Sequence, residues 1–464
     1  MRKMGCGYKK IVLALIIGLI SFSCLYAKEQ NVRKAISVLD YGAVPDDGKD
    51  DTKALRKAVD YCRANSGTIL MMPAGEYRLR DDQADALEKK MYSGKYPNPE
   101  KEVFVPYYPH VKGLNFDGAE SITIEAKGAV LMCEGWMEPL SILNCKNRPA
   151  ILIQGSLNTI LNGVTIHSQP GMGIVGFDSK DITLNHLSVE PAAGYMFSTN
   201  TDATHFACCE GVLKFDNCFF RGQGDDATNV HGYYHNITSV AGNQVTLELA
   251  GINTHASASD VPRVGDKLEL VRISTLAPER ELEVAHKPKS NRSLVRLKGE
   301  LPDNFKEYYV CNVSKLPRVE FCNSVVWGQL ARGVLIKTRG VKIANNVFKG
   351  CTGTAIHIGA ESFWKEGSHA KDVTITDNLI VNCGLGAGCI KGASSIAVAI
   401  EAPDTENTIL HEGIRITGNT IIGSSKNKCG IMLRNVRHVE LQDNRIEGCQ
   451  NGVLMQSVEN IQMK

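Results

Sequence analysis

Short apolar segments alternate with small polar turns over most of this chain, and the same pattern returns at a nearly constant interval. Each copy predicts a short strand, a turn opened by glycine and a second short strand. Where no insertion intervenes, the interval is 22 to 25 residues. Five stretches show it most clearly: "FDNCFFRGQGDDATNVH" (215–231), "FCNSVVWGQLARGVLIK" (321–337), "IANNVFKGCTGTAIHIG" (343–359), "ITGNTIIGSSKNKCGIML" (416–433) and "LQDNRIEGCQNGVLMQ" (441–456).

This repeat predicts an all-β fold, a right-handed parallel β-helix. Strands this short cannot bury an apolar face alone, but they can when successive coils stack and each strand pairs in parallel with its copies. An asparagine recurs just before an apolar strand in four coils, and we interpret these residues as a ladder of stacked amides inside the helix. The ladder residues are Asn346, Asn378, Asn419 and Asn444.

The segment "DYGAVPDDGKDDTKAL" (40–55) predicts a helix that caps the open end of the β-helix and protects its first strand edges. Asp51 stands where a helix N-cap is expected. Apolar residues follow it at helical spacing. They are Ala54, Leu55, Ala58, Val59 and Cys62.

Residues 233–316 interrupt the repeat with alternating strand patterns such as "VGDKLELVR", which predict a small inserted antiparallel β-domain. The expected division is a signal peptide (1–27), the N-terminal part of the β-helix (28–232), the insert, and the C-terminal part (317–464). The final "VENIQMK" resembles the opening strand of a further coil, so we expect the natural protein to continue.

The first residues predict export. "MRKMGCGYKK" is a basic region, "IVLALIIGLISFS" is apolar but short for a membrane span, and "CLYA" contains small residues suited to cleavage near Ala27. We therefore expect a periplasmic protein, or a cell-surface lipoprotein associated with the outer membrane if Cys24 is lipidated. The oligomeric state stays open.

The net charge is +2, which argues against nucleic acid as the main partner and leaves neutral ligands open. The chain has 15 cysteines but no CxxC motif, so neither a zinc ribbon nor a thioredoxin-type site is indicated. Several cysteines recur at equivalent repeat positions, which favours a role as small buried apolar residues.

One turn differs from its copies by carrying two adjacent acids, Asp225 and Asp226. Aligned on the turn glycine, the equivalent residues are Ala331 and Arg332 in one later coil, and Gly353 and Thr354 in the next. Two neighbouring carboxyl groups raise the pKa of one of them. This is a known way to keep a carboxylic acid protonated near neutral pH.

Asp202 precedes Asp225 by 23 residues, one coil step, so stacking is expected to bring the three carboxyl groups together. Three such groups suit glycoside hydrolysis, in which one acid protonates the leaving oxygen and a carboxylate activates water or attacks the sugar. The same set would also suit a Ca²⁺ ion. A solvated surface turn is the simplest alternative.

Several polar residues are expected near these acids as substrate-binding groups. Arg332 aligns with Asp226, Lys337 with His231, and His357 with Asn229. The enlarged loop "HIGAESFWKEGSHA" (357–370) adds Glu361 and Trp364, whose ring could support a sugar face, and His205 follows Asp202 closely. Glu401 is a further, outlying carboxylate.

"NTD" at 200–202 followed one coil later by "GDD" at 224–226 resembles the polygalacturonases, family 28 of the glycoside hydrolases. "RGVLIK" matches that family's RIK motif only loosely. The run "TNTDATHFACCEGVLKFDNCFFRGQGDDATNVHG", the "DYGAVPDDGKDDTKAL" start and the insert together are more similar to family 110, the bacterial exo-α-1,3-galactosidases that act on blood-group-B-type glycans.

The family 110 resemblance implies inverting hydrolysis of a terminal α-1,3-galactoside without a metal or other cofactor. Carried over, Asp202, Asp225 and Asp226 are the catalytic residues, with Asp225 favoured as the acid and the other two holding the water. Two alternatives stay open. One is a β-helical lyase or polygalacturonase-like hydrolase acting on an acidic polysaccharide, and the other is a glycan adhesin without catalysis.

Overall fold

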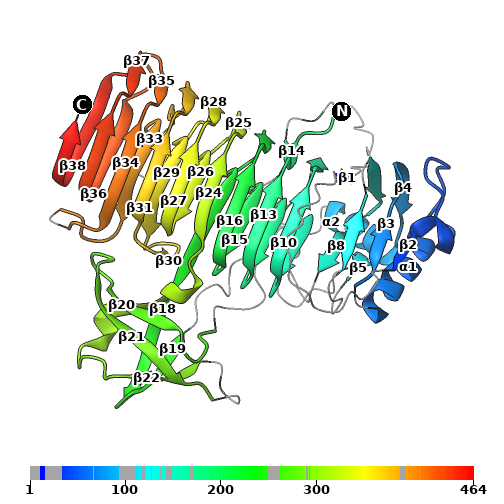
Figure 1. Ribbon diagram of the computed structural model, residues 1–464, viewed down its shortest axis with the longest axis horizontal. Helices are drawn as coiled ribbons and strands as arrows, with labels where there is room; N and C mark the ends of the chain where they lie inside the picture. The colour runs from blue at the N-terminus through cyan, green and yellow to red at the C-terminus, as the bar shows by residue number, and fades with distance from the viewer. Residues whose placement is uncertain are drawn as a thin grey trace, which may run out of the picture.

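The computed structural model shows an elongated stack of coils with an antiparallel domain on one side (Figure 1). Apart from residues 11–15, the predicted signal peptide lies outside the described residues, as does Asn200. The structure describes residues 11–15, 34–65, 67–93, 111–116, 122–126, 128–135, 137–142, 149–167, 169, 171–193, 195, 197–199, 201–248, 261–288, 291, 293–386, 393–406 and 408–463.

One long sheet contains strands of three to five residues from successive coils. All its neighbouring strands pair in parallel except β1, which pairs antiparallel with β7 and β11. In spatial order the strands are β4 (Gly75–Leu79), β7 (Ala129–Cys133), β1 (Ile11–Leu15), β11 (Val164–His167), β14 (Ser188–Glu190), β17 (Phe219–Arg221), β25 (Val325–Trp327), β28 (Val347–Lys349), β32 (Leu379–Val381), β35 (Thr420–Ile422) and β37 (Arg445–Glu447).

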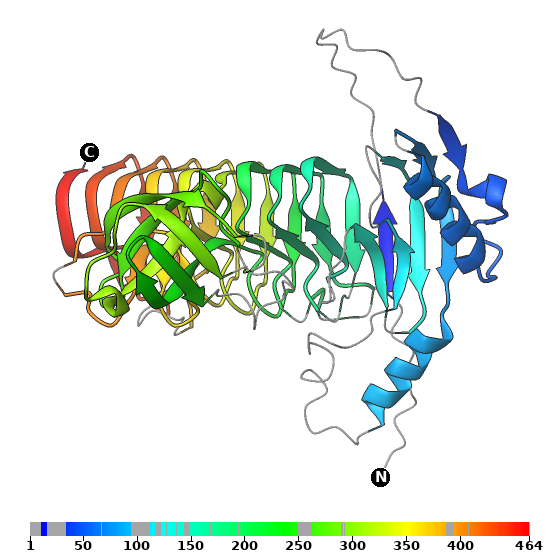
Figure 2. The same ribbon diagram turned by 90° about the horizontal axis from the view of Figure 1, so that it is seen from below.

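A second, larger sheet contains the remaining strands of the coils, and Figure 2 shows its strands following one another along the stack. They are β5 (Lys112–Asn115), β8 (Glu138–Ile142), β9 (Ile151–Gln154), β10 (Leu157–Asn162), β12 (Ile174–Phe177), β13 (Lys180–Asn185), β15 (Thr204–Ala207), β16 (Glu210–Asp216), β18 (Thr228–Ala241), β24 (Arg318–Cys322), β26 (Val334–Lys337), β27 (Arg339–Ala344), β29 (Ile356–Glu361), β30 (Glu366–Gly367), β31 (Lys371–Thr376), β33 (Ile396–Glu401), β34 (His411–Thr417), β36 (Cys429–Gln442) and β38 (Asn451–Met463).

Successive side chains along a strand point alternately into the apolar core and toward a second face that carries polar side chains. In β15, Phe206 belongs to the continuous apolar core, whereas His205 on the opposite side does not. The pairing of β15 with β18 places Val230 in the same core column and Asn229 beside His205. The predicted parallel β-helix is therefore confirmed, and its regular pairing fixes which polar residues are neighbours.

The predicted asparagine ladder is present. Asn346 donates through Nδ2 to Asn378 Oδ1, Asn378 to Asn419 and Asn419 to Asn444, each over 2.9 Å. The first three amides therefore donate to the next coil through their nitrogens, and all four accept through their oxygens.

The N-terminal elements form the expected cap. They are β2 (Ala35–Ser37), η1 (Val38–Tyr41), α1 (Thr52–Ala64), β3 (Ile69–Met71), α2 (Asp82–Tyr92) and β6 (Thr123–Glu125). α1 begins just after Asp51, which occupies the predicted N-cap position, but its side chain forms no capping hydrogen bond. The Asp51 carboxylate instead accepts from the backbone amides of Val44 and Arg78, both at 2.9 Å, and so joins the loop to β4.

The inserted antiparallel domain begins as a continuation of β18 and returns to the coils at β24. Its pairing is antiparallel throughout, and Tyr234 of β18 faces Cys311 of β23. Its other elements are β19 (Gln244–Glu248), β20 (Lys267–Arg272), β21 (Pro278–His286), β22 (Leu294–Lys298), η2 (Phe305–Glu307), β23 (Tyr308–Asn312) and η3 (Val313–Lys315). The residue numbers that divide the chain into domains remain a prediction.

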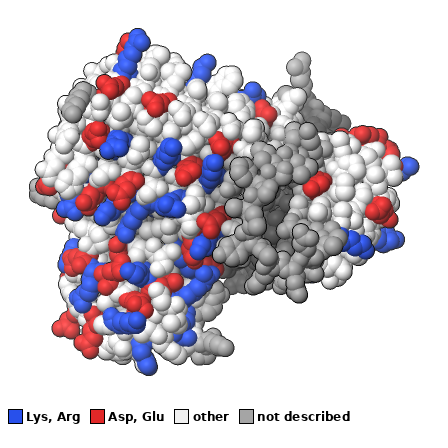
Figure 3. Space-filling view, in the orientation of Figure 1, with Lys and Arg blue, Asp and Glu red and all other residues white. Residues whose placement is uncertain are grey.

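The described cysteines are all free thiols, and nine of the eleven are buried, as expected of small apolar residues. Within the described ranges, no helix is long and apolar enough to cross a membrane. Positive and negative side chains are interspersed on the visible face of both the coils and the insert (Figure 3).

Candidate active site

The two adjacent aspartates lie in the turn between β17 and β18. Asp226 is buried, with 1% of its surface exposed, whereas Asp225 is half-buried. Thr204 of β15 pairs with Thr228 of β18, so the local step is 24 residues, one more than predicted, and Asp202 lies beside Asp226. The Asp226 backbone amide donates to Asp202 Oδ1 over 3.2 Å. One oxygen from each of the three carboxyl groups lies within 4.8 Å of the others.

Arg332 occupies the next coil at the position that the sequence alignment predicted. Its Nε donates to both oxygens of Asp226, over 3.0 and 3.1 Å, and its backbone amide donates to Oδ1 over 2.9 Å. Its Nη1 donates to Glu361 Oε1 over 2.8 Å. Arg332 therefore joins the aspartate turn to the end of β29.

Crowding and burial change the acidity of two of these aspartates. Burial, followed by the charges of Asp202 and Asp226, raises the pKa of Asp225 to about 8. Burial, followed by the charge of Asp226, raises the pKa of Asp202 well above its ordinary range. At neutral pH the cluster therefore retains protons, and Asp225 is the member with the larger exposed surface.

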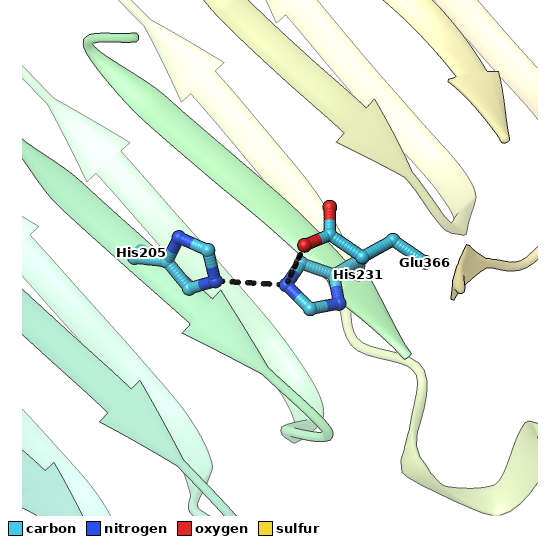
Figure 4. Close-up of side chains that lie close together, drawn as sticks. All are labelled: His205, His231 and Glu366. Atoms are coloured by element: carbon cyan, nitrogen blue, oxygen red, sulfur yellow. Dashed lines mark hydrogen bonds and ion pairs between the residues drawn. The ribbon is translucent and has the colours of Figure 1, made fainter. Parts of the chain in front are cut away.

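A chain of buried side chains leads away from Asp202, and Figure 4 shows its far part. His205 Nδ1 lies 2.7 Å from Asp202 Oδ2, and His205 Nε2 lies 2.8 Å from His231 Nε2. His231 Nε2 is in turn 3.5 Å from Glu366 Oε1. Burial lowers the pKa of both imidazoles, that of His231 to about 3.

Lys337 connects the two glutamates at the other side of the site. Its Nζ lies 2.6 Å from Glu361 Oε2 and also contacts Glu366 Oε2, to which Asn229 Nδ2 donates over 3.2 Å. Burial raises the pKa of Glu361, but Lys337 and Arg332 outweigh it and bring it to about 2. Lys337 and Arg332 are the two permanent cations among five carboxyl groups: Asp202, Asp225, Asp226, Glu361 and Glu366.

The predicted binding residues differ in how they could meet a sugar. His231 and Lys337 have no exposed surface, so in this arrangement neither reaches a sugar and both hold other side chains instead. His357 is also buried, and burial lowers its pKa to about 3. It lies in the same column as Asn229, as the sequence alignment predicted, with Leu335 in the coil between them.

Trp364 is the predicted contact with the largest exposed surface, at 56%. It stands with Phe363, itself 76% exposed, between Glu361 and Glu366, and the two rings meet edge to face at 5.1 Å. Glu401 pairs in register with Glu361 at the end of β33, and burial followed by the charge of Glu361 raises its pKa.

Glu366 is the site residue that sequence reasoning missed. It lies in the loop whose enlargement was noted, but the loop has no copy in other coils, so the repeat gives no position for it. In the structure β30 folds back and pairs antiparallel with β18, placing Glu366 opposite Tyr233.

Two groups of side chains have the composition of metal ligands: Asp202, Asp225 and Asp226, and His205, His231 and Glu366. The first is a set of oxygen donors of the kind Ca²⁺ prefers, but Arg332 already donates to both oxygens of Asp226. In the second, the nitrogens are 2.8 Å apart, a hydrogen-bond distance, whereas two histidines on a tetrahedral Zn²⁺ would hold their nitrogens about 3.3 Å apart.

The site brings together the carboxyl groups that glycoside hydrolysis requires, on the strands of a parallel β-helix. A family model described as glycosyl hydrolases family 28 matches residues 107–246. The chain is 27% identical over 304 residues to alpha-1,3-galactosidase A of Bacteroides fragilis (strain YCH46), which covers 62% of this chain and 50% of that protein. It is 23% identical over 502 residues to alpha-1,3-galactosidase A of Shewanella woodyi, covering 83% and 82%.

The predicted similarity to α-1,3-galactosidases, and more distantly to polygalacturonase-like proteins, is thus confirmed. The chain spans about half the length of several of the curated relatives it matches. Among solved structures, a mutant tailspike protein of E. coli bacteriophage HK620 in complex with pentasaccharide shares the fold. Its TM-score is 0.51 at 11% identity, with 92% of this chain and 65% of that chain covered.

Proposed function

We propose that the chain is an exo-acting, inverting glycoside hydrolase that releases terminal α-1,3-linked galactose from blood-group-B-type or linear Gal-α-1,3-Gal glycans. One observation carries the proposal: three carboxyl groups converge within 4.8 Å, and the accessible one is a weak acid. The names of the curated relatives support the linkage and the sugar.

Asp225 is the general acid in this proposal. A group with a pKa of about 8 carries its proton at neutral pH, as an acid must before it can protonate the leaving oxygen. Asp225 is also the half-buried member of the trio, whereas the other two are 4% and 1% exposed. A substrate oxygen therefore reaches Asp225 first.

Asp202 and Asp226 hold the attacking water. Arg332 fixes Asp226 through both oxygens, and His205 fixes one oxygen of Asp202, so the two carboxyl groups have defined orientations. The nearest oxygens are closer than the roughly 6.5–9.5 Å separation usual for inverting pairs. Inversion here requires the water to lie beside two carboxyl groups rather than between an isolated pair, and the first anomer released tests this directly.

The charge balance of the site favours a neutral sugar over a uronate. A uronate needs a cation for its carboxylate, but Arg332 and Lys337 are already bound by Asp226, Glu361 and Glu366. A further negative charge would face an excess of carboxyl groups. This argues against the polygalacturonase-like hydrolase and the lyase, both of which act on acidic polysaccharide.

The test follows hydrolysis of Gal-α-1,3-Gal and of its fucosylated form by proton NMR, using the full chain. We expect β-galactose as the first product, and Asp225→Asn should lower kcat about 10²–10⁴-fold because the general acid is lost. The matched control is Asp303→Asn, an exposed aspartate of the insert, which should leave kcat unchanged.

Four results would overturn the proposal. An Asp225→Asn variant that keeps the parental rate would show that Asp225 is not the general acid. Release of α-galactose as the first product would show that the configuration is retained and not inverted. A galactoside that binds tightly yet remains intact after long incubation identifies an adhesin instead. Cleavage that produces an unsaturated product and depends on calcium identifies a lyase.

A further inference from the structure

A line of buried side chains runs from Asp202 through two histidines to Glu366. It joins Asp202 Oδ2 to His205 Nδ1 over 2.7 Å, and His205 Nε2 to His231 Nε2 over 2.8 Å. Glu366 Oε1 follows 3.5 Å beyond His231 (Figure 4). Every one of these residues is buried.

The far end of the line fixes where hydrogens can be. His231 Nδ1 lies 2.9 Å from the carbonyl oxygen of Gly232, which can only accept, so this nitrogen carries a hydrogen. When His231 is neutral, its Nε2 is therefore an acceptor, and His205 Nε2 must donate to it. When His205 is also neutral, its Nδ1 becomes an acceptor, and the hydrogen of the last bond belongs to Asp202.

We propose that this line is a proton relay that exchanges one proton between Asp202 and His231, and that His231 and Glu366 are positioning residues that set the charge of Asp202. In the exchange, the O–H bond of Asp202 breaks as an N–H bond forms at His205 Nδ1. The N–H bond at His205 Nε2 breaks as one forms at His231 Nε2. Asp202 becomes a carboxylate and His231 an imidazolium, and no electron is transferred.

Glu366 makes the second state accessible. Its carboxylate lies 3.5 Å from the nitrogen that receives the proton, so it stabilises the imidazolium. Burial raises the pKa of Glu366, but His231, when charged, and Lys337 lower it below the ordinary value. Burial and the charge of Lys337 oppose the imidazolium, as does a charged His205, and the Tyr233 ring meets His231 edge to face at 4.9 Å.

The near end of the relay experiences mainly negative charge. Burial lowers the pKa of His205, and Lys337 lowers it further, whereas the charges of Glu366, Asp226 and Asp225 oppose this shift. Burial, followed by the charge of Asp226 and then that of Glu366, raises the pKa of Asp202, whereas Arg332 and the Asp226 backbone amide lower it. The proton is therefore favoured on Asp202, and the state with a carboxylate at Asp202 and an imidazolium at His231 is the minor one.

The role of the relay rests on the proposed function. Glycoside hydrolysis needs one carboxyl group that donates a proton and another that accepts one from water. With its proton withdrawn toward His231, Asp202 is a carboxylate ready to accept that proton, while Asp225 keeps its own. Two crowded aspartates thereby take opposite roles.

The first experiment reads the relay in the free protein, without substrate. Long-range proton–nitrogen NMR on protein labelled with ¹⁵N at histidine should show one hydrogen shared between two Nε2 atoms, and His231→Gln should remove that signal. Two Nε2 atoms without a hydrogen would overturn the relay, because an ion would then have to join them. Metal content measured on the same sample identifies that case.

The second experiment uses Glu366→Gln, which keeps the shape and removes the charge. The imidazolium is then less stable, so through the relay Asp202 keeps its proton to higher pH and the acidic limb of kcat/KM should move up by about one pH unit. A direct charge effect alone would move the limb down, because the charge of Glu366 raises the pKa of Asp202. A downward move would therefore overturn the relay. The matched control is Glu269→Gln, a buried glutamate paired with Arg339 outside the site, whose profile should not move.

An unchanged acidic limb in Glu366→Gln would overturn the relay, as would the same shift in both variants. The NMR result stands even if Glu366→Gln fails to fold. If the shared hydrogen is found but no galactoside is cleaved, the proposed function fails and the proton relay stands. If galactose is released but no hydrogen is shared, the reverse holds.

Discussion

Two stacks of polar side chains run along the coils. One consists of four asparagines in the later coils. The other, the ionic stack, consists of Asp202, Asp226 and Arg332 at the turns before β15, β18 and β26. Both are stacks of polar side chains whose neighbours are set by parallel pairing. An amide donates and accepts at once, so identical asparagines satisfy one another. A carboxylate only accepts, so stacked aspartates cannot satisfy one another and need other donors: the Asp226 backbone amide donates to Asp202, and Arg332 donates to Asp226.

The two stacks therefore respond differently to change. The asparagine ladder stabilises the fold and holds no charge to offer a ligand. The ionic stack retains protons and charges that a fully paired network would not have, and this is the property that chemistry can use. Three substitutions test this contrast, and each affects one stack more than the other.

The largest effect is expected from Arg332→Met. The change leaves Asp226 and Glu361 buried without their shared cation, at a cost of roughly 3–5 kcal/mol in the free energy of unfolding, together with loss of hydrolysis. Urea unfolding and kcat measure the two effects. Arg318→Met, at an exposed position of β24, should change neither, and an equally stable Arg332→Met variant would show that the ionic stack is not held by this residue.

A smaller effect is expected from Asn378→Ala in the ladder. Neighbouring amides lose a partner on both sides, which should lower the free energy of unfolding by about 1–3 kcal/mol while kcat stays the same. Asn444→Ala, at the partly exposed end of the ladder, should have less effect. A loss of activity in Asn378→Ala beyond its loss of folded protein would contradict the separation of the two stacks.

The smallest effect concerns the stability of Asp225→Asn at different pH. Because the folded pKa is about 8 and the unfolded one about 4, the stability that Asp225 contributes is complete below pH ~4 and is lost as pH rises through ~8. The Asp225→Asn variant does not lose this stability at high pH, because its amide does not ionise. Its melting temperature should exceed that of the parent by a few degrees at pH 9 and match it at pH 4; an equal difference at both would refute the raised pKa.

The repeat allowed much of this architecture to be predicted. A fixed interval with glycine turns identifies the coils, the ladder and the stacking of Asp226 with Arg332, because parallel pairing converts sequence spacing directly into contact. The predicted step from Asp202 was 23 residues, whereas the structure has 24, so Asp202 lies beside Asp226 and not beside Asp225. One extra turn residue changes the step without disturbing the apolar pattern.

Other features required the structure because they break the repeat. Glu366 reaches the site through a strand that folds back, which no periodicity encodes. Asp51 has the residue type of an N-cap, but two backbone amides from other segments compete for its carboxylate and bind it. The sequence predicted that His231 and Lys337 bind substrate, because polar residues on the outer side of a strand are usually exposed. In the structure other side chains bury both residues, so they hold those side chains instead.

Tyr234 and Cys311 face each other across β18 and β23, so the inserted domain leaves and rejoins the coils through a single paired stem. The coil on each side of the insert keeps its register, so Arg332 can complete a turn formed by residues far before it in the sequence. The insert also packs on the coils, where Tyr309 shares an apolar cluster with Ala360 and Ile400. A different guest domain at this point would therefore have to keep the stem and cover the same apolar side chains to leave the groups around Asp226 in place.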